Sequence, residues 1–282
     1  MKLVRYGRPG KEVAGLIDSE GNLRDLSRAI GDITPVTIGE IAQLKKANIN
    51  RLKVVKGKQR LGACVNNVGK FIAIGLNFID HAKESGAPIP KEPVVFMKTT
   101  SCIQGPNDPI VMPKGSRKTD WEVELGVVIG RKATYVPEEK ALNYVAGYCV
   151  VNDVSEREFQ LERSGGQWDK GKGCDTFGPI GPWLVTRDEI KDVQNLGMWL
   201  TVNGEKRQNG STKAMIFSVA KLVSYCSEFM TLNPGDIITT GTPPGVGLGM
   251  KPAPQYLKAG DVVELGIEGL GQQRQEVRAY KG

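Results

Sequence analysis

The most constraining feature of the chain is a pair of glutamates at the head of an apolar run, Asp120-Trp-Glu-Val-Glu-Leu-Gly-Val-Val-Ile129. If residues 121 to 130 form a β-strand, Glu122 and Glu124 point to the same face, roughly 7 Å apart. Acidic side chains rarely enter a protein interior unless they are paired or hold a metal. The pattern therefore predicts either two metal ligands or a strand with one solvated face.

A third carboxylate, Asp153, closes the next hydrophobic run. Three carboxylates from two strands would form an all-oxygen site, which suits Mg²⁺, Mn²⁺ or Ca²⁺ better than zinc. The competing interpretation is a half-exposed sheet, where Glu-x-Glu most often faces solvent. Val263-Glu-Leu-Gly266 repeats Val123-Glu-Leu-Gly126 with Val262 in place of the first acid, and we expect that repeat to be a structural strand.

Composition narrows the class of protein. The chain has 282 residues, enough for one large domain with a small appendage, and its 40% hydrophobic and 24% charged content is typical of a globular protein. No apolar run is long enough to span a membrane, and no signal-peptide core follows Met1. The five scattered cysteines predict free thiols in a reducing cytosol, and hence a cytoplasmic protein.

The net charge of +7 raises the question of a nucleic-acid partner. The lysines and arginines are spread along the chain, and the nearest approach to a cluster, Lys45-Lys46 through Lys58, has no interleaved aromatic residues. We therefore expect no nucleic-acid partner and no membrane partner. A modest positive field would also attract a small anionic substrate.

The order of expected elements predicts a mainly β protein with a few helices (α+β) and a soft boundary near residue 65. Residues 1–65 would form a small N-terminal β domain, and residues 66–282 a larger one. Beyond the boundary, Asn77 is expected to cap a helix with Asp80 in capping-box position and an end at Gly86. The other expected elements are strands 71–75, 94–98, 122–129 and 144–152, a hairpin turn at Asn203-Gly204, and a helix over 219–229.

Imidazole chemistry can come only from His81, the single histidine. Glu84 lies three residues on, on the same face of the expected helix, where a carboxylate can fix the imidazole tautomer and strengthen it as a base. In isolation, the pair is more simply a surface helix with an incidental His and Glu. Nearby glycines and prolines suit a segment that closes over a site.

Two loops add polar groups that could face a ligand. Gly171-Lys-Gly173 places Lys172 where the backbone can approach a ligand closely, although a solvated loop is the simpler interpretation. Thr239-Thr-Gly-Thr-Pro243 follows a strand but has neither a phosphate-binding Gly-Lys-Ser/Thr nor a following helix. It could bind a carboxylate or sugar hydroxyls, or it could be a turn.

Taken together and in this order, these segments resemble the fumarylacetoacetate hydrolase family over roughly residues 70 to 250. The resemblance implies a mixed β-roll of that family's C-terminal domain type, and a homodimer. It implies Mg²⁺ or Mn²⁺ bound by Glu122, Glu124 and Asp153. It also implies catalytic roles for His81, Glu84 and Lys172, and substrate contacts from Arg157, Gln160 and Thr242.

The stretch Leu161–Gly166 through Gly181–Val185 is most similar to the sugar-acid branch of the family, whose members are often labelled ureidoglycolate lyase. That branch hydrolyses 2,4-diketo-3-deoxy derivatives of L-rhamnonate or L-fuconate. Gly173-Cys174 departs from the Ser-Phe of many acylpyruvate-cleaving relatives.

The chemistry that the resemblance implies is hydrolysis of a C–C bond in a small anionic 2,4-diketo acid. Water attacks one carbonyl with His81 as base, pyruvate departs as its enolate, and a small hydroxy acid such as lactate remains. A divalent cation chelated by the 2-oxo acid stabilises the developing charge. The alternatives are acylpyruvate hydrolysis or oxaloacetate decarboxylation at the same site and, outside enzymes, a carbohydrate- or nucleic-acid-binding β-protein.

Overall fold

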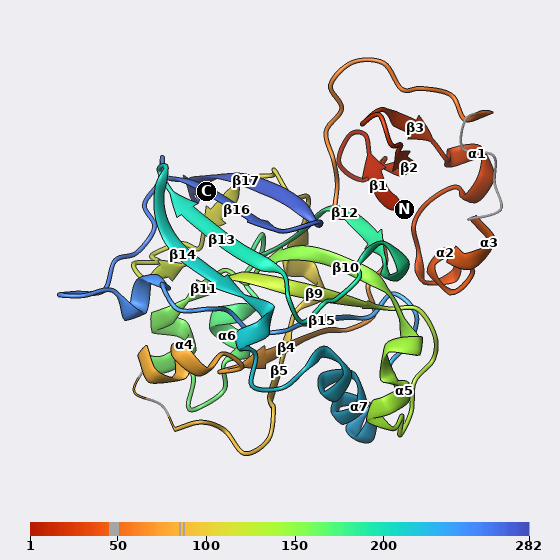
Figure 1. Cartoon of the computed structure of the whole chain (residues 1–282). Coiled ribbons are helices and arrows are strands. Elements are labelled where there is room, and N and C mark those ends of the chain that lie inside the picture. The colour runs from red at the N-terminus through yellow and green to blue at the C-terminus, as the bar shows by residue number, and fades with distance from the viewer. Residues whose placement is uncertain (45–50, 85, 87, 282) are drawn as a thin grey trace.

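The computed structural model describes residues 1–44, 51–84, 86 and 88–281. Strands dominate the structure, as predicted, and form open mixed sheets rather than a closed barrel. Figure 1 shows the N-terminal strands and helices as a lobe beside the main body of sheets. Among the described residues, no helix is long and apolar enough to cross a membrane.

The main sheet has ten strands, and its two central strands are buried along their whole length, which explains their continuous apolar sequences. Most of its pairs are antiparallel, but β15 runs parallel to β4, and β6 runs parallel to β12. In spatial order the strands are β3 (Leu23–Asp25), β2 (Val13–Ile17), β1 (Lys2–Tyr6), β12 (Gly178–Thr186), β10 (Val145–Asn152), β9 (Val123–Ile129), β15 (Ile237–Thr239), β4 (Phe71–Gly75) and β5 (Val94–Lys98), with β6 (Ile103–Gln104) beside β12.

A second sheet of five strands packs against the first. Its order is β14 (Glu205–Ser211), β13 (Gly197–Val202), β16 (Val262–Ile267), β17 (Gly271–Ala279) and β7 (Ile110–Met112). Asn203 and Gly204 join β13 to β14 with φ angles of 52° and 80°, so the predicted hairpin turn is confirmed. A short ladder joins β8 (Thr119–Asp120) to β11 (Ser155–Glu156).

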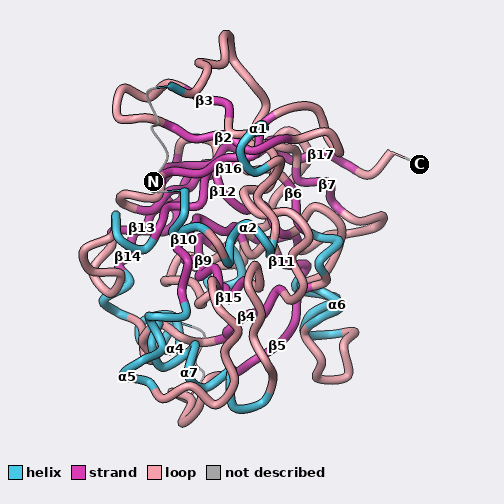
Figure 2. Tube along the Cα trace, turned by 90° about the vertical axis from the view of Figure 1, so that its right-hand side faces the viewer, coloured by secondary structure: helices cyan, strands magenta, loops and turns pink. Residues whose placement is uncertain are grey.

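Helices are few and mostly a single turn. The longest, α7 (Val219–Phe229), matches its predicted range and begins where the Ser218 hydroxyl accepts a hydrogen bond from the Lys221 amide at 3.1 Å. Figure 2 places α7 beside α5 at one end of the molecule. The others are α1 (Ser27–Ile30), α2 (Pro35–Gly39), α3 (Ile41–Leu44), α4 (Ile79–Glu84), α5 (Glu138–Ala141), α6 (Asp169–Lys172) and a π-helical turn, η4 (Glu158–Glu162).

The N-terminal segment is joined to the rest of the chain through the main sheet. Lys2 and Leu3 of β1 pair with Val185 and Leu184 of β12, so β1, β2 and β3 extend the sheet at one end. A division into domains at residue 65 stays a prediction.

The predicted cap of α4 is wrong. The helix begins at Ile79 and its described part ends at Glu84, so Asn77 lies too early to cap it. The Asn77 amide instead donates to the backbone oxygen of Thr240 at 2.8 Å, and its oxygen accepts from the Phe217 amide at 2.8 Å. Asn77 therefore fixes the start of α4 to the loop after β15, a long-range contact that local spacing does not reveal.

Candidate metal and catalytic site

The three predicted carboxylates come together where β9 begins and β10 ends. The two strands are antiparallel neighbours, with Glu124 opposite Val151, and the Asp153 amide donates to the Glu122 backbone oxygen at 2.9 Å. This register places Glu122 just before one strand and Asp153 just after the other. One oxygen from each of Glu122, Glu124 and Asp153 lies within 4.8 Å of the other two, close enough to share one ion.

These carboxylates are buried, with exposed fractions of 5% for Glu122, 1% for Glu124 and 1% for Asp153. Buried acids at this spacing repel one another unless cations neutralise them. Asp153 Oδ1 makes no hydrogen bond within the described part of the chain, although Lys98 Nζ lies 2.6 Å away. An all-oxygen donor set of three carboxylates fits Mg²⁺ or Mn²⁺.

Two buried lysines supply positive charge to the triad. Lys172 Nζ lies 2.7 Å from both Glu122 Oε2 and Asp153 Oδ2, and Lys98 Nζ pairs with the other oxygen of Asp153. Lys98 also donates to the backbone oxygen of Lys172, so it holds the turn that carries that residue. Lys172 thus bridges two of the candidate metal ligands.

The guanidinium of Arg157 also contacts the triad, through Glu122. Arg157 Nη2 donates to Glu122 Oε1 at 2.7 Å, Nη1 to Gln160 Oε1 at 2.9 Å, and Nε to Asp120 Oδ2 at 2.8 Å. Arg157 is 4% exposed and Asp120 fully buried, so the contacts operate with little solvent screening. Arg157 and Gln160 therefore reach the cavity already oriented.

The electrostatics of the two glutamates differ. Burial alone would raise the pKa of Glu122, but the charges of Lys172 and Arg157 outweigh it and hold the pKa well below its usual range. Burial and the charges of Asp153 and Glu122 raise the pKa of Glu124 well above its usual range. Thr239 Oγ1 and the Gly241 amide donate to Glu124 Oε2 at 2.5 and 2.9 Å. The two neighbouring carboxylates thus disfavour ionisation of Glu124, and a divalent cation bound beside it would offset that repulsion.

The predicted His–Glu pair forms on α4. His81 Nδ1 lies 3.2 Å from Glu84 Oε2, and the Glu84 carboxylate also accepts the Gly245 amide at 3.1 Å. A proton on Nδ1 directed at Glu84 leaves the basic lone pair on Nε2 of His81. Glu84 therefore orients the imidazole and fixes α4 to the loop that follows Thr242.

Thr242 lines the cavity, but its hydroxyl has structural partners. It donates to the Val123 backbone oxygen at 2.9 Å and accepts from Gln208 Nε2 at 2.8 Å. A role for this hydroxyl in binding substrate stays a prediction, as it does for Gln160, whose oxygen is held by Arg157.

All nine predicted site residues line one cavity of about 470 Å³. One part of its wall is apolar, with Phe96 and Trp168 packed edge to face at 5.3 Å between ring centroids. Gly75 makes room for the indole, since a Cβ there would lie 2.3 Å from Trp168. The rest of the apolar lining consists of Ile74, Leu76, Leu161, Val246 and Leu248. The aromatic part of the wall adjoins the charged groups, since Lys172 Nζ lies 5.5 Å from the centroid of the Phe96 ring.

Three contributors to the site were missed by sequence reasoning: Asp120, Lys98 and the Phe96–Trp168 pair. Asp120 is two residues before Glu122, so strand periodicity could have placed it in the series of acids. Lys98 ends an apolar strand, a weak signal for a buried charge. Nothing in the sequence indicates that Phe96 and Trp168 meet, because they come from distant elements.

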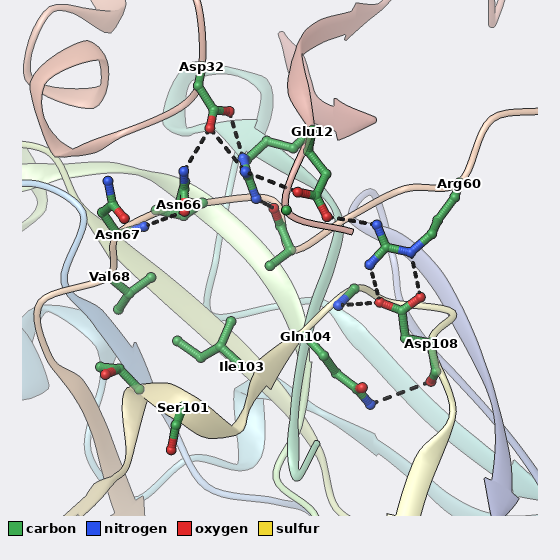
Figure 3. A pocket seen from close by; sticks show the side chains of 16 residues that line it. Glu12, Asp32, Arg60, Asn66, Asn67, Val68, Ser101, Ile103, Gln104 and Asp108 are labelled. Atoms are coloured by element: carbon green, nitrogen blue, oxygen red, sulfur yellow. Dashed lines mark hydrogen bonds and ion pairs between the residues drawn. The ribbon is translucent and has the colours of Figure 1, made fainter. Parts of the chain in front are cut away.

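A larger cavity of about 830 Å³ lies between the N-terminal segment and the main body. Figure 3 shows Arg60 in contact with Asp108 and Glu12. Asp32 pairs with Arg5, whose Nε lies 2.6 Å from Asp32 Oδ1. Arg60 and Arg5 are thus neutralised within the wall. Among the residues described around this cavity, the carboxylates of Glu12, Asp32 and Asp108 are therefore paired with arginines.

Residues 70–278 match the family described as fumarylacetoacetate (FAA) hydrolase C-terminal. A protein of Burkholderia multivorans, named no more specifically than as a hydrolase, is 63% identical over the full length of both chains. A Burkholderia cenocepacia protein with the same general name is 62% identical over 99% of each.

Solved structures agree in fold. A fumarylacetoacetate hydrolase from Exiguobacterium antarcticum superposes with a TM-score of 0.89 and 35% identity, covering 99% of this chain and 100% of that one. A maleylpyruvate hydrolase from Sphingobium sp. SYK-6, solved with manganese(II) and pyruvate, gives a TM-score of 0.83 and 26% identity over the whole of both chains. The predicted β-roll is therefore confirmed.

Proposed function

The chain belongs to the fumarylacetoacetate hydrolase family, and from that premise we propose that it is a metal-dependent hydrolase of a carbon–carbon bond in a 2,4-diketo acid. The observation that carries the proposal is the convergence of Glu122, Glu124 and Asp153 beside Lys172, in the cavity that also holds His81 and Glu84. This arrangement combines an oxygen-rich cation site with a general base, the two requirements of the reaction.

The residues divide the work of the reaction. A bound Mg²⁺ or Mn²⁺ would act as a Lewis acid on the 2-oxo acid. His81, held through Nδ1 by Glu84, accepts a proton from the attacking water at Nε2. Lys172 and Arg157 offset the negative charge that the substrate carboxylate and the developing enolate bring beside Glu122. The apolar side chains that line the cavity lower the dielectric around these charges and strengthen their effect.

For the substrate, our first candidate is a 2,4-diketo-3-deoxy sugar acid that yields pyruvate and a small hydroxy acid such as lactate. It rests on the similarity of residues 161–185 to the sugar-acid branch. The aromatic wall of Phe96 and Trp168 favours a second candidate, an acylpyruvate with a less hydroxylated acyl chain. The manganese(II) and pyruvate named with the Sphingobium relative support a metal-dependent, pyruvate-releasing reaction in both cases.

The repeated Val-Glu-Leu-Gly provides a matched test of the metal site. Glu124→Gln removes one candidate ligand, whereas Glu264→Gln makes the same change at a glutamate whose side chain is 42% exposed and lies 3.6 Å from Arg274. We expect Mn²⁺ to raise the melting temperature of the wild type and of Glu264→Gln, but not of Glu124→Gln or Glu122→Gln. Pyruvate release should likewise persist in Glu264→Gln and be lost in Glu124→Gln and Glu122→Gln. Full turnover by metal-stripped Glu122→Gln would refute the proposal.

Decarboxylation of oxaloacetate is the nearest rival reaction, because it needs enolate stabilisation but no attacking water. His81→Asn separates the two, since loss of a general base typically lowers a rate by about 10²–10⁴-fold. We expect hydrolysis to fall by that factor while any decarboxylation persists. A pyruvate-release assay on diketo sugar acids, acylpyruvates and oxaloacetate, each with Mg²⁺ and Mn²⁺, identifies the preferred substrate.

A homodimer and a cytoplasmic location are also proposed, the first from the family resemblance and the second from the five cysteines, all of which are free. Light scattering on the purified protein measures the oligomeric state. A protein that neither binds Mn²⁺ nor releases pyruvate would instead favour the non-enzymatic alternative, a carbohydrate- or nucleic-acid-binding β-protein.

A further inference from the structure

Asp120 is a fully buried carboxylate beside the metal site that is not itself part of the candidate triad. Its Oδ1 accepts the Gly247 amide at 2.7 Å, and its Oδ2 accepts the Leu248 amide at 3.0 Å. Gly247 is required for this contact, because a Cβ there would lie 2.7 Å from Asp120 Oδ1. Asp120 therefore binds the tight turn η7 (Gly247–Gly249) through its backbone.

The same carboxylate also binds a cation that touches a candidate metal ligand. Arg157 Nε donates to Asp120 Oδ2 at 2.8 Å, and Nη2 of the same guanidinium donates to Glu122 Oε1 at 2.7 Å. Arg157 is thus shared between Glu122, a candidate metal ligand, and Asp120, which lies outside the triad. How strongly the guanidinium charge attracts Glu122 therefore depends on the charge of Asp120.

The turn held by Asp120 is part of the cavity wall. Val246, Leu248 and Gly249 line the cavity, and Glu84 accepts the Gly245 amide at the near end of the loop. Two carboxylates therefore bind the loop through its backbone amides. Glu84 also contacts the proposed base His81, and Asp120 also accepts a hydrogen bond from Arg157. The loop, the base and the cation are fixed relative to one another.

We propose that Asp120 is a positioning residue that couples the substrate-facing loop 245–249 to the metal-binding carboxylates through Arg157. It balances the guanidinium charge, so that Glu122 stays available to a divalent cation, and it fixes the turn that shapes the apolar side of the cavity. This inference rests on the proposed metal site and adds a residue outside it. Partners of metal ligands typically change metal affinity by about 10–100-fold when they are lost.

Asp120→Asn tests the coupling. The asparagine amide nitrogen would face two donors, Arg157 Nε and Leu248 N, and the whole guanidinium charge would act on Glu122. Calorimetric titration of the metal-free protein with Mn²⁺ should show an affinity at least about tenfold weaker than that of the wild type. Hydrogen exchange should be faster at the Gly247 and Leu248 amides.

Two further variants separate this effect from general destabilisation. Asp236→Asn alters an equally buried aspartate that binds Lys70 Nζ at 2.9 Å and the Asn233 amide at 2.8 Å, at the start of β15 and away from the triad. It should lower the melting temperature and leave Mn²⁺ affinity unchanged. Asp120→Asn combined with Arg157→Gln removes both charges and should return Mn²⁺ affinity to within about threefold of wild type, while exchange at Gly247 and Leu248 stays fast.

The outcomes are distinct. The inference is overturned if Asp120→Asn binds Mn²⁺ within about threefold of wild type, if Arg157→Gln fails to restore the affinity, or if exchange at the two amides is unchanged. If Asp120→Asn does not fold, the single Arg157→Gln variant tests the inference instead. Removing the guanidinium charge next to Glu122 should leave Mn²⁺ affinity no weaker than in the wild type, and a weaker affinity would overturn the inference. Wild-type protein that binds no Mn²⁺ would instead overturn the proposed metal site and this inference with it.

Discussion

Replacing Lys98 by methionine removes a buried positive charge and keeps a side chain of similar length. The Lys98 side chain is fully buried, and its Nζ lies 2.6 Å from Asp153 Oδ1. It also donates to the backbone oxygens of Val154, at 3.3 Å, and of Lys172. A methionine thioether replaces none of these interactions, so the change leaves Asp153 Oδ1 without its ion-pair partner and two carbonyls without their donor.

The size of the effect follows from the burial of this pair. Breaking a buried ion pair by removing one partner costs about 3–5 kcal/mol. Asp153 keeps Lys172 at 2.7 Å from its other oxygen, so we expect the lower end of that range, about 3 kcal/mol. For a chain near this size, each kcal/mol shifts the melting temperature by about 2–4 °C, which gives a loss of roughly 6–12 °C.

Calorimetric melting with EDTA and with Mn²⁺ measures both the loss and its dependence on metal. In the absence of metal, Lys98→Met leaves the triad with one more uncompensated negative charge, which a divalent cation would partly neutralise. Mn²⁺ should therefore raise the melting temperature of Lys98→Met more than that of the wild type. The control is Lys83→Met, whose ion pair with Asp80 is 69% and 65% exposed and should contribute at most about 1 kcal/mol.

A melting temperature for Lys98→Met within about 2 °C of wild type in EDTA would refute the reasoning about its burial. An equal response of both proteins to Mn²⁺ would refute the electrostatic link between Lys98 and the triad, whatever the loss in EDTA.

Two further predictions concern other parts of the molecule. Burial opposes ionisation of Asp32, but the hydrogen bonds and charge of Arg5 outweigh it and lower the pKa of this carboxyl. The ionised Asp32 therefore stabilises the folded protein above its unfolded-state pKa of about 4, and this stabilisation is lost as the pH falls through the lower pKa of the folded state. Asp32→Asn should thus melt below wild type at pH 7, and melting curves should converge below about pH 4. Gly75→Ala should displace the Trp168 indole and lower the free energy of unfolding by about 1–3 kcal/mol. It should also raise KM for substrates with a long acyl group, and an unchanged KM would show that Trp168 does not contact that group.

Much of the fold could be predicted from local patterns. Strand β5 and helix α7 occupy their predicted ranges, because a short continuous apolar run predicts the first and helical apolar spacing predicts the second. The hairpin at Asn203-Gly204 also follows from local backbone preference. The cap of α4 failed because Asn77 satisfies its amide across the structure, with Thr240 and Phe217, rather than within its own helix.

The site could be predicted in its chemistry but not in its supports. Glu122, Glu124 and Asp153 are recognisable because strand period and chain order fix which side chains share a face. The roles of Lys98, Asp120 and the turn at Gly247 do not follow from local sequence, because they depend on contacts between elements far apart in the chain. Charge balance is a property of the packed cluster.

The two copies of Val-Glu-Leu-Gly separate what the sequence determined from what only the tertiary structure decided. In both, the sequence determined a strand with the glutamate on a defined face: Glu124 lies in β9 and Glu264 in β16. Glu124 is 1% exposed among carboxylates and cations, whereas the side chain of Glu264 is 42% exposed beside Arg274. The physical reason is position, since β9 is covered on both faces within the main sheet and β16 presents Glu264 to solvent. Local sequence sets the direction of a side chain, and the packing of distant strands decides whether that direction leads to water or to a buried metal site.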